Sequence, residues 1–552
     1  GSTTVTMTTV NNANGGNMDF APVTTLTITG TLNNSGTIHF NESGTITIAT
    51  LSNTETGIIY LNGNEHIQIA TPDTDSGTFY FEGDMDAGAS VFTLSGDVPG
   101  YYHIIFSARD GNQDVFETSS DLNVFGNITF NAGTLNLSAG NAITTAGTIS
   151  IDSGILNASG NVTVAHDLMI SSAGIFTLLT DNTLSVSDTV SLSGDGILNA
   201  SAGNMAIHHL IITAGTLTAP GDGHLFTVSG NFSTTESNQF IHNDGTVTLN
   251  GGNQSIFGNN IFYNLIKTTD TDVTLTLEAG KTQTILGNIT LTGSPPADMD
   301  DVEHFLSVFS SANAATMITL VPGGTQFLRH LKVRYNTASG LPLITRRSFN
   351  LGHNINWFFE GVSILWQGDV SDNWDDPRNW ETGLLPLGGD TAQIPQVSFP
   401  NLPPKLYSSP IYIKNLNIET GASLFLNGQE FIVDEVVSNE GTIELIGNEP
   451  TPSFGTYDVD SGRFSYVGNG DDQPDEFTIF DFGEVDYYDL SINDSTRRDV
   501  FIKQDDHALS IVHNLNVTIG TLDISQNNNT LIIAEAGTLI VDGGTLIADE
   551  AT

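Results

Sequence analysis

Acidic side chains gathered in short turns are the residues of this sequence best suited to chemistry. DTDSG at 73–77 and DMDAG at 84–88 both have the pattern D-x-D-x-G, and a further turn, GNGDDQPDE, is denser in acids. Carboxylates that alternate along a turn can converge on one calcium ion, which takes about six to eight oxygen ligands. The sequence therefore offers calcium as a candidate ligand, with solvated acidic turns as the alternative, because no complete EF-hand loop is present. The acids concerned are Asp73, Asp75, Asp84, Asp86, Asp471, Asp472 and Asp475.

A second candidate site lies in a tryptophan-rich segment. All four tryptophans of the chain fall between Trp357 and Trp380, and the last three are Trp366, Trp374 and Trp380. Exposed indole rings can stack on a sugar ring, whereas buried ones can close the end of a hydrophobic core. The sequence favours a core-closing cap for these three residues and keeps glycan binding as the alternative.

Catalytic constellations are hard to assemble from the remaining residues. The chain has no cysteine, which excludes disulfides and thiol catalysis. Adjacent Asp pairs are scattered along the chain, whereas acid–base catalysis needs two carboxyl groups in one cleft. The chain is therefore not predicted to be an enzyme, and a β-helix polysaccharide lyase is kept only as a third alternative. Five of the 15 basic residues cluster, and we expect them to lie on an outer face and pair with nearby acids; they are Arg329, Lys332, Arg334, Arg346 and Arg347.

The overall charge narrows the choice of partners and location. The chain has 62 acidic and 15 basic residues, a formal net charge of -47. Such a field repels nucleic acid and anionic membrane surfaces. No apolar run is long enough to span a bilayer. We expect an acidic extracellular or cell-surface protein that binds no nucleic acid and inserts into no membrane.

The elements that must position these residues are short strands with a repeated motif. Gly-Thr or Gly-Ile followed by two residues and an apolar residue recurs along the chain, for example as GTIHF, GTLNL, GTVTL and GTLDI. Apolar and polar residues that alternate between Gly, Asn and Asp turns are typical of β-strands. A longer unit with several strands occurs at 77–138, 245–293 and 462–525. Such repeats predict a solenoid, in which each coil buries its apolar face against its neighbours.

The kind of solenoid follows from the near absence of helical spacing. Strand-only coils of about 20–25 residues favour an all-β parallel β-helix, with a β-propeller as the alternative. About two dozen coils with strands about 4.8 Å apart would form a rod on the order of 110–120 Å long. The segment 298–317 is the one candidate helix. The residues predicted to point inward in successive coils are Leu135, Ile149 and Val162.

The tryptophan-rich segment also divides the chain. SFNLGHNINWFF ends one run of strands, and prolines between Pro386 and Pro410 interrupt the next, since proline cannot serve a central ladder. We therefore predict two stacked solenoid domains with an irregular Trp- and Pro-rich junction. The predicted parts are a first solenoid at 1–359, the irregular opening of the second domain at 360–410, and a second solenoid at 411–552.

These motifs carry a family resemblance. The unit GTVTLNG…FYNLI…GNITLTG, the closing G-x-N-x-N-W and the opening W-x-G…W-x-x-x-x-N-W resemble modules of large repeat-rich secreted bacterial β-solenoid proteins, of the filamentous-haemagglutinin-like and giant-adhesin-like class. The similarity covers the chain from about residue 25 onward. It implies export and a cell-surface, filament or adhesive role, with no catalytic residues to carry over.

Both ends of the sequence still carry the strand pattern. TTVTMTTV stands near the start, and NNNTLIIAEAGTLIVDGGTLIADEAT is still repeating at the end. An uncovered coil offers free strand edges to another chain. We therefore expect either a piece of a longer solenoid or a head-to-tail assembly of copies, which would form a filament. The predicted function is a noncatalytic extracellular structural subunit, and the alternative is an adhesin that binds a glycan or host surface.

Overall fold

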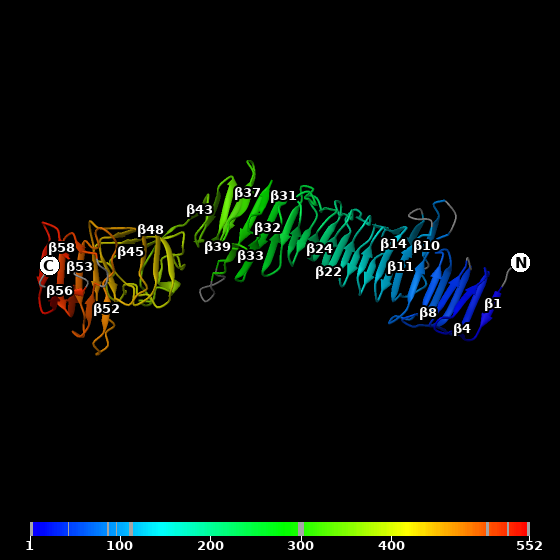
Figure 1. The fold of residues 1–552 in the computed structure, drawn as a ribbon, viewed down its shortest axis with the longest axis horizontal. Helices are drawn as coiled ribbons and strands as arrows, with labels where there is room; N and C mark the ends of the chain where they lie inside the picture. Colours follow the sequence, from blue (N-terminus) through cyan, green and yellow to red (C-terminus); the bar gives the residue numbers. More distant parts are fainter. Residues whose placement is uncertain are drawn as a thin grey trace.

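The chain folds into a long stack of β-strand coils. The computed structural model describes residues 4–41, 44–84, 88–94, 96–109, 114–295, 303–503, 507–526 and 529–548. It is an all-β parallel β-solenoid of about 25 turns, which confirms the predicted fold class. Figure 1 shows an elongated rod with the two termini at opposite ends. Only about 1% of the chain is helical, and one 3-10 turn, η1, covers Pro377–Asn379.

The repeated motif forms the rungs of this stack. β15 (Thr134–Leu137) pairs in parallel with β18 (Ile155–Ala158), so Leu135 lies directly beside Leu156. Because side chains alternate across a strand, both leucines point into the core, while the polar residues between them face outward. The prediction of the inward-facing positions is confirmed, since complete burial is found for Leu135, Ile149 and Val162.

One local prediction is wrong. The segment 298–317, the one candidate helix, contains β36 (Leu306–Ser310) and the start of β37 (Thr316–Leu320), and its residues 298–302 lie outside the described residues. The reason is that its fully buried positions, not all of its apolar residues, follow a period of two. Leu306 and Val308 are fully buried and pair with strands on both neighbouring coils, whereas Ser307 between them is partly exposed.

Turns near the N-terminal end are held by a ladder of buried asparagines. Nδ2 of Asn12 donates to Oδ1 of Asn34 over 2.8 Å, and Nδ2 of Asn34 donates to Oδ1 of Asn53 over the same 2.8 Å. Buried amides need hydrogen-bond partners, and the amide nitrogens of Asn12 and Asn34 each find one on the next coil. The ladder therefore fixes the register between successive coils.

Two hydrophobic cores fill the rod. The first runs from residue 10 to residue 357 and the second from residue 364 to residue 524; we call these parts the first and second solenoids. β43 (Trp357–Glu360) is the last strand of the first solenoid, and β44 (Ser363–Leu365) starts a new sheet with β45 (Thr391–Ile394). Figure 1 shows the offset between β43 and β45. The change of core lies near residue 360, and the division into three domains stays a prediction.

The first and last described coils each contain three short strands. The first coil consists of β1 (Thr4–Met7), β2 (Val10–Asn12) and β3 (Asn17–Phe20). The last coil consists of β58 (Leu531–Ile533), β59 (Thr538–Val541) and β60 (Thr545–Ile547). Apart from β2, in which Val10 and Asn12 are buried, the strands of both coils are more exposed than those in the middle of the rod.

Candidate functional site

The first acidic turn holds backbone groups. Oδ2 of Asp73 accepts the backbone N–H of Asn53 at 2.6 Å, and Oδ1 accepts those of Asp75 and Ser76, both at 3.2 Å. Both oxygens of Asp73 are therefore engaged by donors from its own turn and the neighbouring coil. In the second D-x-D-x-G turn Asp84 is described and Asp86 lies outside the described residues.

The third acidic turn is satisfied in a similar way. Asp471 accepts a backbone N–H two residues further on at 2.9 Å, and Asp475 accepts Nδ2 of Asn469 at 2.7 Å. Asp472 lies 3.1 Å from Nε of Arg498. Across the described residues, no group of three or more His, Asp or Glu side chains converges as a metal ion would require. Calcium at the acidic turns stays a prediction.

The three tryptophans of the second candidate site are packed in the core of the second solenoid. Trp366, Trp374 and Trp380 are each 1% exposed. Ring centroids lie 5.0 Å apart for Trp366 and Trp380 and 4.7 Å for Trp374 and Trp380, edge to face in both cases. Nε1 of Trp366 donates to the carbonyl of Leu402 at 2.7 Å, and Nε1 of Trp380 to that of Trp374 at 2.9 Å. The rings lie at the start of the second core and leave almost no surface for a sugar.

Arg347 joins the two solenoids. Its Nη2 lies 2.5 Å from Oε1 of Glu303, in the first solenoid, and its Nη1 lies 3.2 Å from Oδ2 of Asp390, in the second. The Arg347 side chain is 14% exposed, and that of Asp390 is fully buried. The expectation that all five clustered bases lie on an outer face is therefore wrong for Arg347, because acids from both solenoids surround it.

The electrostatics of this junction favour one cation between two carboxylates. Burial raises the pKa of Glu303 and of Asp390, and the charge of Arg347 opposes that rise in both. Burial, together with Arg347 and Arg329, lowers the pKa of His330 to about 4. His330 is therefore neutral at pH 7, and Arg347 supplies the positive charge.

A set of side-chain acceptors that is not among the sequence-predicted site residues connects neighbouring coils. In four places a polar side chain accepts the backbone N–H of an asparagine on the next coil, at 2.8 or 2.9 Å. The sequence does carry a signal, since each acceptor ends a run YYH, IHH, FYN or YYD, and each donor follows Gly or His. The pairs are His103 with Asn127, His209 with Asn231, Asn264 with Asn288, and Asp489 with Asn514.

A second set of side chains that the sequence did not point to accepts hydrogen bonds from the backbone N–H groups of their own turns. In NGNE and IGNE the side chains of Glu65 and Glu449 each accept two backbone N–H groups of their own turn. In the related turn GGNQ, Gln254 accepts one such N–H and also Nζ of Lys267, at 2.6 Å. Lys267 is fully buried, and burial lowers its pKa to about 8. These buried polar groups are thus held by the backbone turns themselves.

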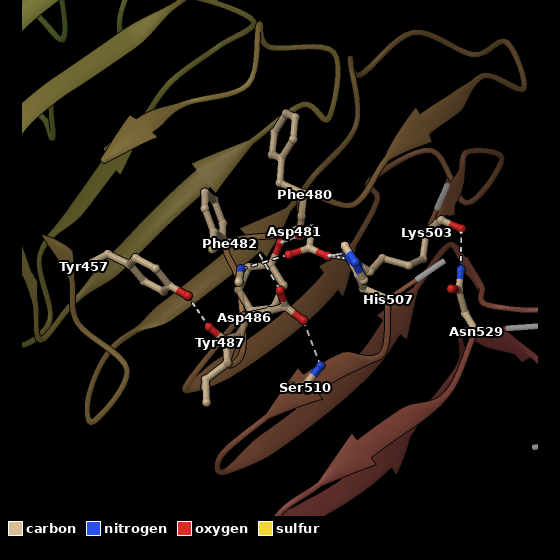
Figure 2. A network of polar contacts seen from close by, with 12 residues as sticks. Tyr457, Phe480, Asp481, Phe482, Asp486, Tyr487, Lys503, His507, Ser510 and Asn529 are labelled. Atoms are coloured by element: carbon tan, nitrogen blue, oxygen red, sulfur yellow. Dashed lines mark hydrogen bonds and ion pairs between the residues drawn. The ribbon is translucent and has the colours of Figure 1, made fainter. Parts of the chain in front are cut away.

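A polar network in the second solenoid is shown in Figure 2. Oδ2 of Asp481 lies 3.0 Å from Nζ of Lys503 and 3.0 Å from Nδ1 of His507. Burial alone would raise the pKa of Asp481, but the contacts with Lys503 and His507 and a backbone N–H hold that pKa below its ordinary value. Asp486 accepts the backbone N–H groups of Phe482 at 3.0 Å and Ser510 at 2.8 Å. The network connects successive coils around the buried side chains of this solenoid.

The fold defines the class of protein: the chain is a β-solenoid repeat protein. No family model, curated protein or solved structure matches it. The resemblance to secreted bacterial solenoid proteins therefore stays a prediction. In the part of the chain that the structure describes, no helix is long and apolar enough to cross a bilayer.

Proposed function

We propose that the chain is a noncatalytic extracellular structural protein whose copies assemble end to end into a filament. The rod itself supports this role, because about 25 stacked turns, with two hydrophobic cores in succession, give one elongated body. The strongly acidic composition is consistent with a soluble extracellular location and supports no nucleic-acid partner. The acidic side chains at the turns hold backbone groups, which is a structural use of charge.

The observation that carries the proposal is the exposed apolar surface of the last coil. Leu539, Ile540 and Val541 of β59 are 44%, 45% and 46% exposed. Among the described residues β59 pairs only with β56 (Asn514–Ile519), so its other edge has no partner strand in this part of the chain. An open edge with apolar side chains is a template for another strand.

The first coil of a second copy offers a matching surface. Within the described residues β1 pairs only with β4 (Thr25–Asn34), so its outer edge likewise has no partner strand there. Both end coils contain three strands, so each strand of the last coil of one copy can pair with a strand of the first coil of the next copy. A contact between different ends of identical chains does not close on itself and therefore builds a linear filament.

Sedimentation velocity and electron microscopy over a range of concentrations test this assembly. We expect particles to lengthen with concentration, and Val541→Lys to suppress that growth by placing a charge in the contact. Val436→Lys is a matched control, because Val436 is also 46% exposed but lies on β48 (Phe431–Asn439), away from either end. Particles of constant length at high concentration, or equal effects of the two variants, would contradict the proposal.

A further inference from the structure

We propose that an outer face at the end of the first solenoid binds a short oligosaccharide that carries a carboxylate. This inference goes beyond the filament-forming role and does not depend on it. The face is formed by β38 (Thr325–Arg329), β41 (Leu343–Arg346) and β43. We call it the junction face, and it consists of Phe327, Arg329, Ile344, Arg346, Phe358 and Glu360.

Two cavities lie side by side on the junction face. Their volumes are about 430 and about 340 Å³, within the range of small-ligand sites. Arg329, Arg346 and Glu360 line both of them. The two arginines therefore stand where a ligand in either cavity would meet them.

The arginines are arranged in a way that the fold alone does not explain. Arg329 and Arg346 are direct partners on adjacent strands, a position in which like charges destabilise a sheet. The chain has only 15 basic residues against 62 acidic ones, so this repeated charge stands out against the composition. A local conflict of this kind is expected where a site serves a ligand.

Both guanidinium groups keep donors for an anion. The guanidinium of Arg329 lies 5.0 Å from the ring centre of Phe327. Arg346 donates through Nε to Glu360 at 3.3 Å, and its terminal nitrogens carry further N–H donors. Arginine pairs with a carboxylate through two parallel hydrogen bonds, so a single carboxylate between these side chains would offset their mutual repulsion.

Exposed apolar side chains stand beside the arginines. Phe327, Ile344 and Phe358 are 51%, 37% and 54% exposed. Ile344 and Phe358 are direct partners on adjacent strands, and Phe327 lines the same cavity as Ile344. A sugar ring has an apolar face of C–H groups and a polar rim, so it can lie against these side chains while its carboxylate reaches the arginines.

The charge of the whole chain limits the size of the ligand. A net charge of -47 repels a long polyanion that extends beyond the junction face. At physiological salt the screening length is about 8 Å, so a short ligand confined to the face experiences mainly the nearby groups. Glu360 is the one acid on the junction face, and it competes with the ligand for Arg346.

Isothermal titration calorimetry of the full chain provides the test, with a galacturonate trisaccharide as the acidic probe and maltotriose as its neutral counterpart. We expect the acidic trisaccharide to bind about tenfold more tightly than maltotriose. A factor of this size corresponds to the free energy of one charge-assisted hydrogen-bond contact. Arg329→Gln with Arg346→Gln should remove about that factor, and Phe327→Ser should weaken binding several-fold. Glu360→Gln should strengthen binding, because it removes the competing carboxylate.

A double variant with the same change in net charge is the matched control. Arg463→Gln with Arg498→Gln alters two arginines of the second solenoid whose side chains are 45% and 51% exposed, and it should leave the affinity unchanged. Thermal melting of each variant establishes that it is folded. The proposal is overturned if the folded native chain binds no acidic trisaccharide, or if the control loses as much affinity. It is also overturned if Phe327→Ser abolishes a concentration-dependent association of copies, since a second chain would then be the occupant.

Discussion

Replacing Arg347 by methionine is expected to destabilise the junction between the two solenoids by about 3–5 kcal/mol. The Arg347 guanidinium stands between two acids, Glu303 and Asp390, whose side chains are 11% and 0% exposed. Methionine keeps much of the length of the side chain and removes its charge. Both carboxylates would then remain buried without a cation, which is the costly way to break a buried ion pair.

The tryptophans of the second core make this loss measurable. Trp366, Trp374 and Trp380 are buried close to the start of that core, so their fluorescence should report its unfolding. For a unit of about 150–250 residues, 1 kcal/mol shifts the melting temperature by about 2–4 °C. A loss of about 3–5 kcal/mol should therefore lower the transition by about 6–20 °C.

Arg346→Met is the matched control, because Arg346 is the preceding residue but its side chain is 63% exposed. Its pair with Glu360 is a surface contact, so we expect a loss of less than about 1 kcal/mol. Adding Glu303→Gln and Asp390→Asn to Arg347→Met should restore most of the stability, since no charge then remains buried. The defect of Arg347→Met should also shrink as the pH falls, because protonation neutralises the two carboxyl groups. Equal melting temperatures for the two single variants would refute the reasoning.

Three further changes test other parts of the structure. Leu135→Ala should cost about 2–5 kcal/mol in chemical unfolding, because it leaves a cavity between stacked coils, and Leu135→Asp should cost more because it buries a charge; a mild effect of either would mean that the register is wrong. His209→Asn should reduce the loss of stability in acid: burial lowers the pKa of His209 in the folded chain, so its contribution is complete above the unfolded value of about 6.5 and is lost as the pH falls through the folded pKa. Melting curves of this variant at pH 8 should match those of the native chain, since Asn264 fills the same role elsewhere. Calcium bound at the acidic turns should raise the melting temperature, and EDTA should reverse this effect. A melting temperature that does not change after exhaustive chelation would contradict calcium binding.

The parts of the structure that the sequence predicts are those governed by local rules. The core positions could be predicted because successive side chains of a strand point to opposite sides, so the apolar side of each strand faces inward. This assigns Leu135, Ile149 and Val162 to the core. In segment 298–317 the buried residues Leu306 and Val308 alternate in the same way, but the flanking Phe305 and Phe309 hide this alternation in the sequence. The junction could not be predicted, because Arg347 lies 44 residues from Glu303 and 43 from Asp390, and only the folded chain brings them together.

The distribution of charge also bears on how such rods would assemble. Acids are spread along the whole chain, where those at the turns hold backbone N–H groups, while a third of the basic residues cluster between Arg329 and Arg347. Two rods lying side by side would bring many acids together, and this repulsion disfavours bundles. At the ends only a few acids meet, and the apolar residues of β59 can be buried there. The charge pattern therefore favours linear growth over lateral packing. Because salt screens the repulsion between exposed charges, raising the ionic strength should promote lateral association of filaments and leave end-to-end contacts largely intact.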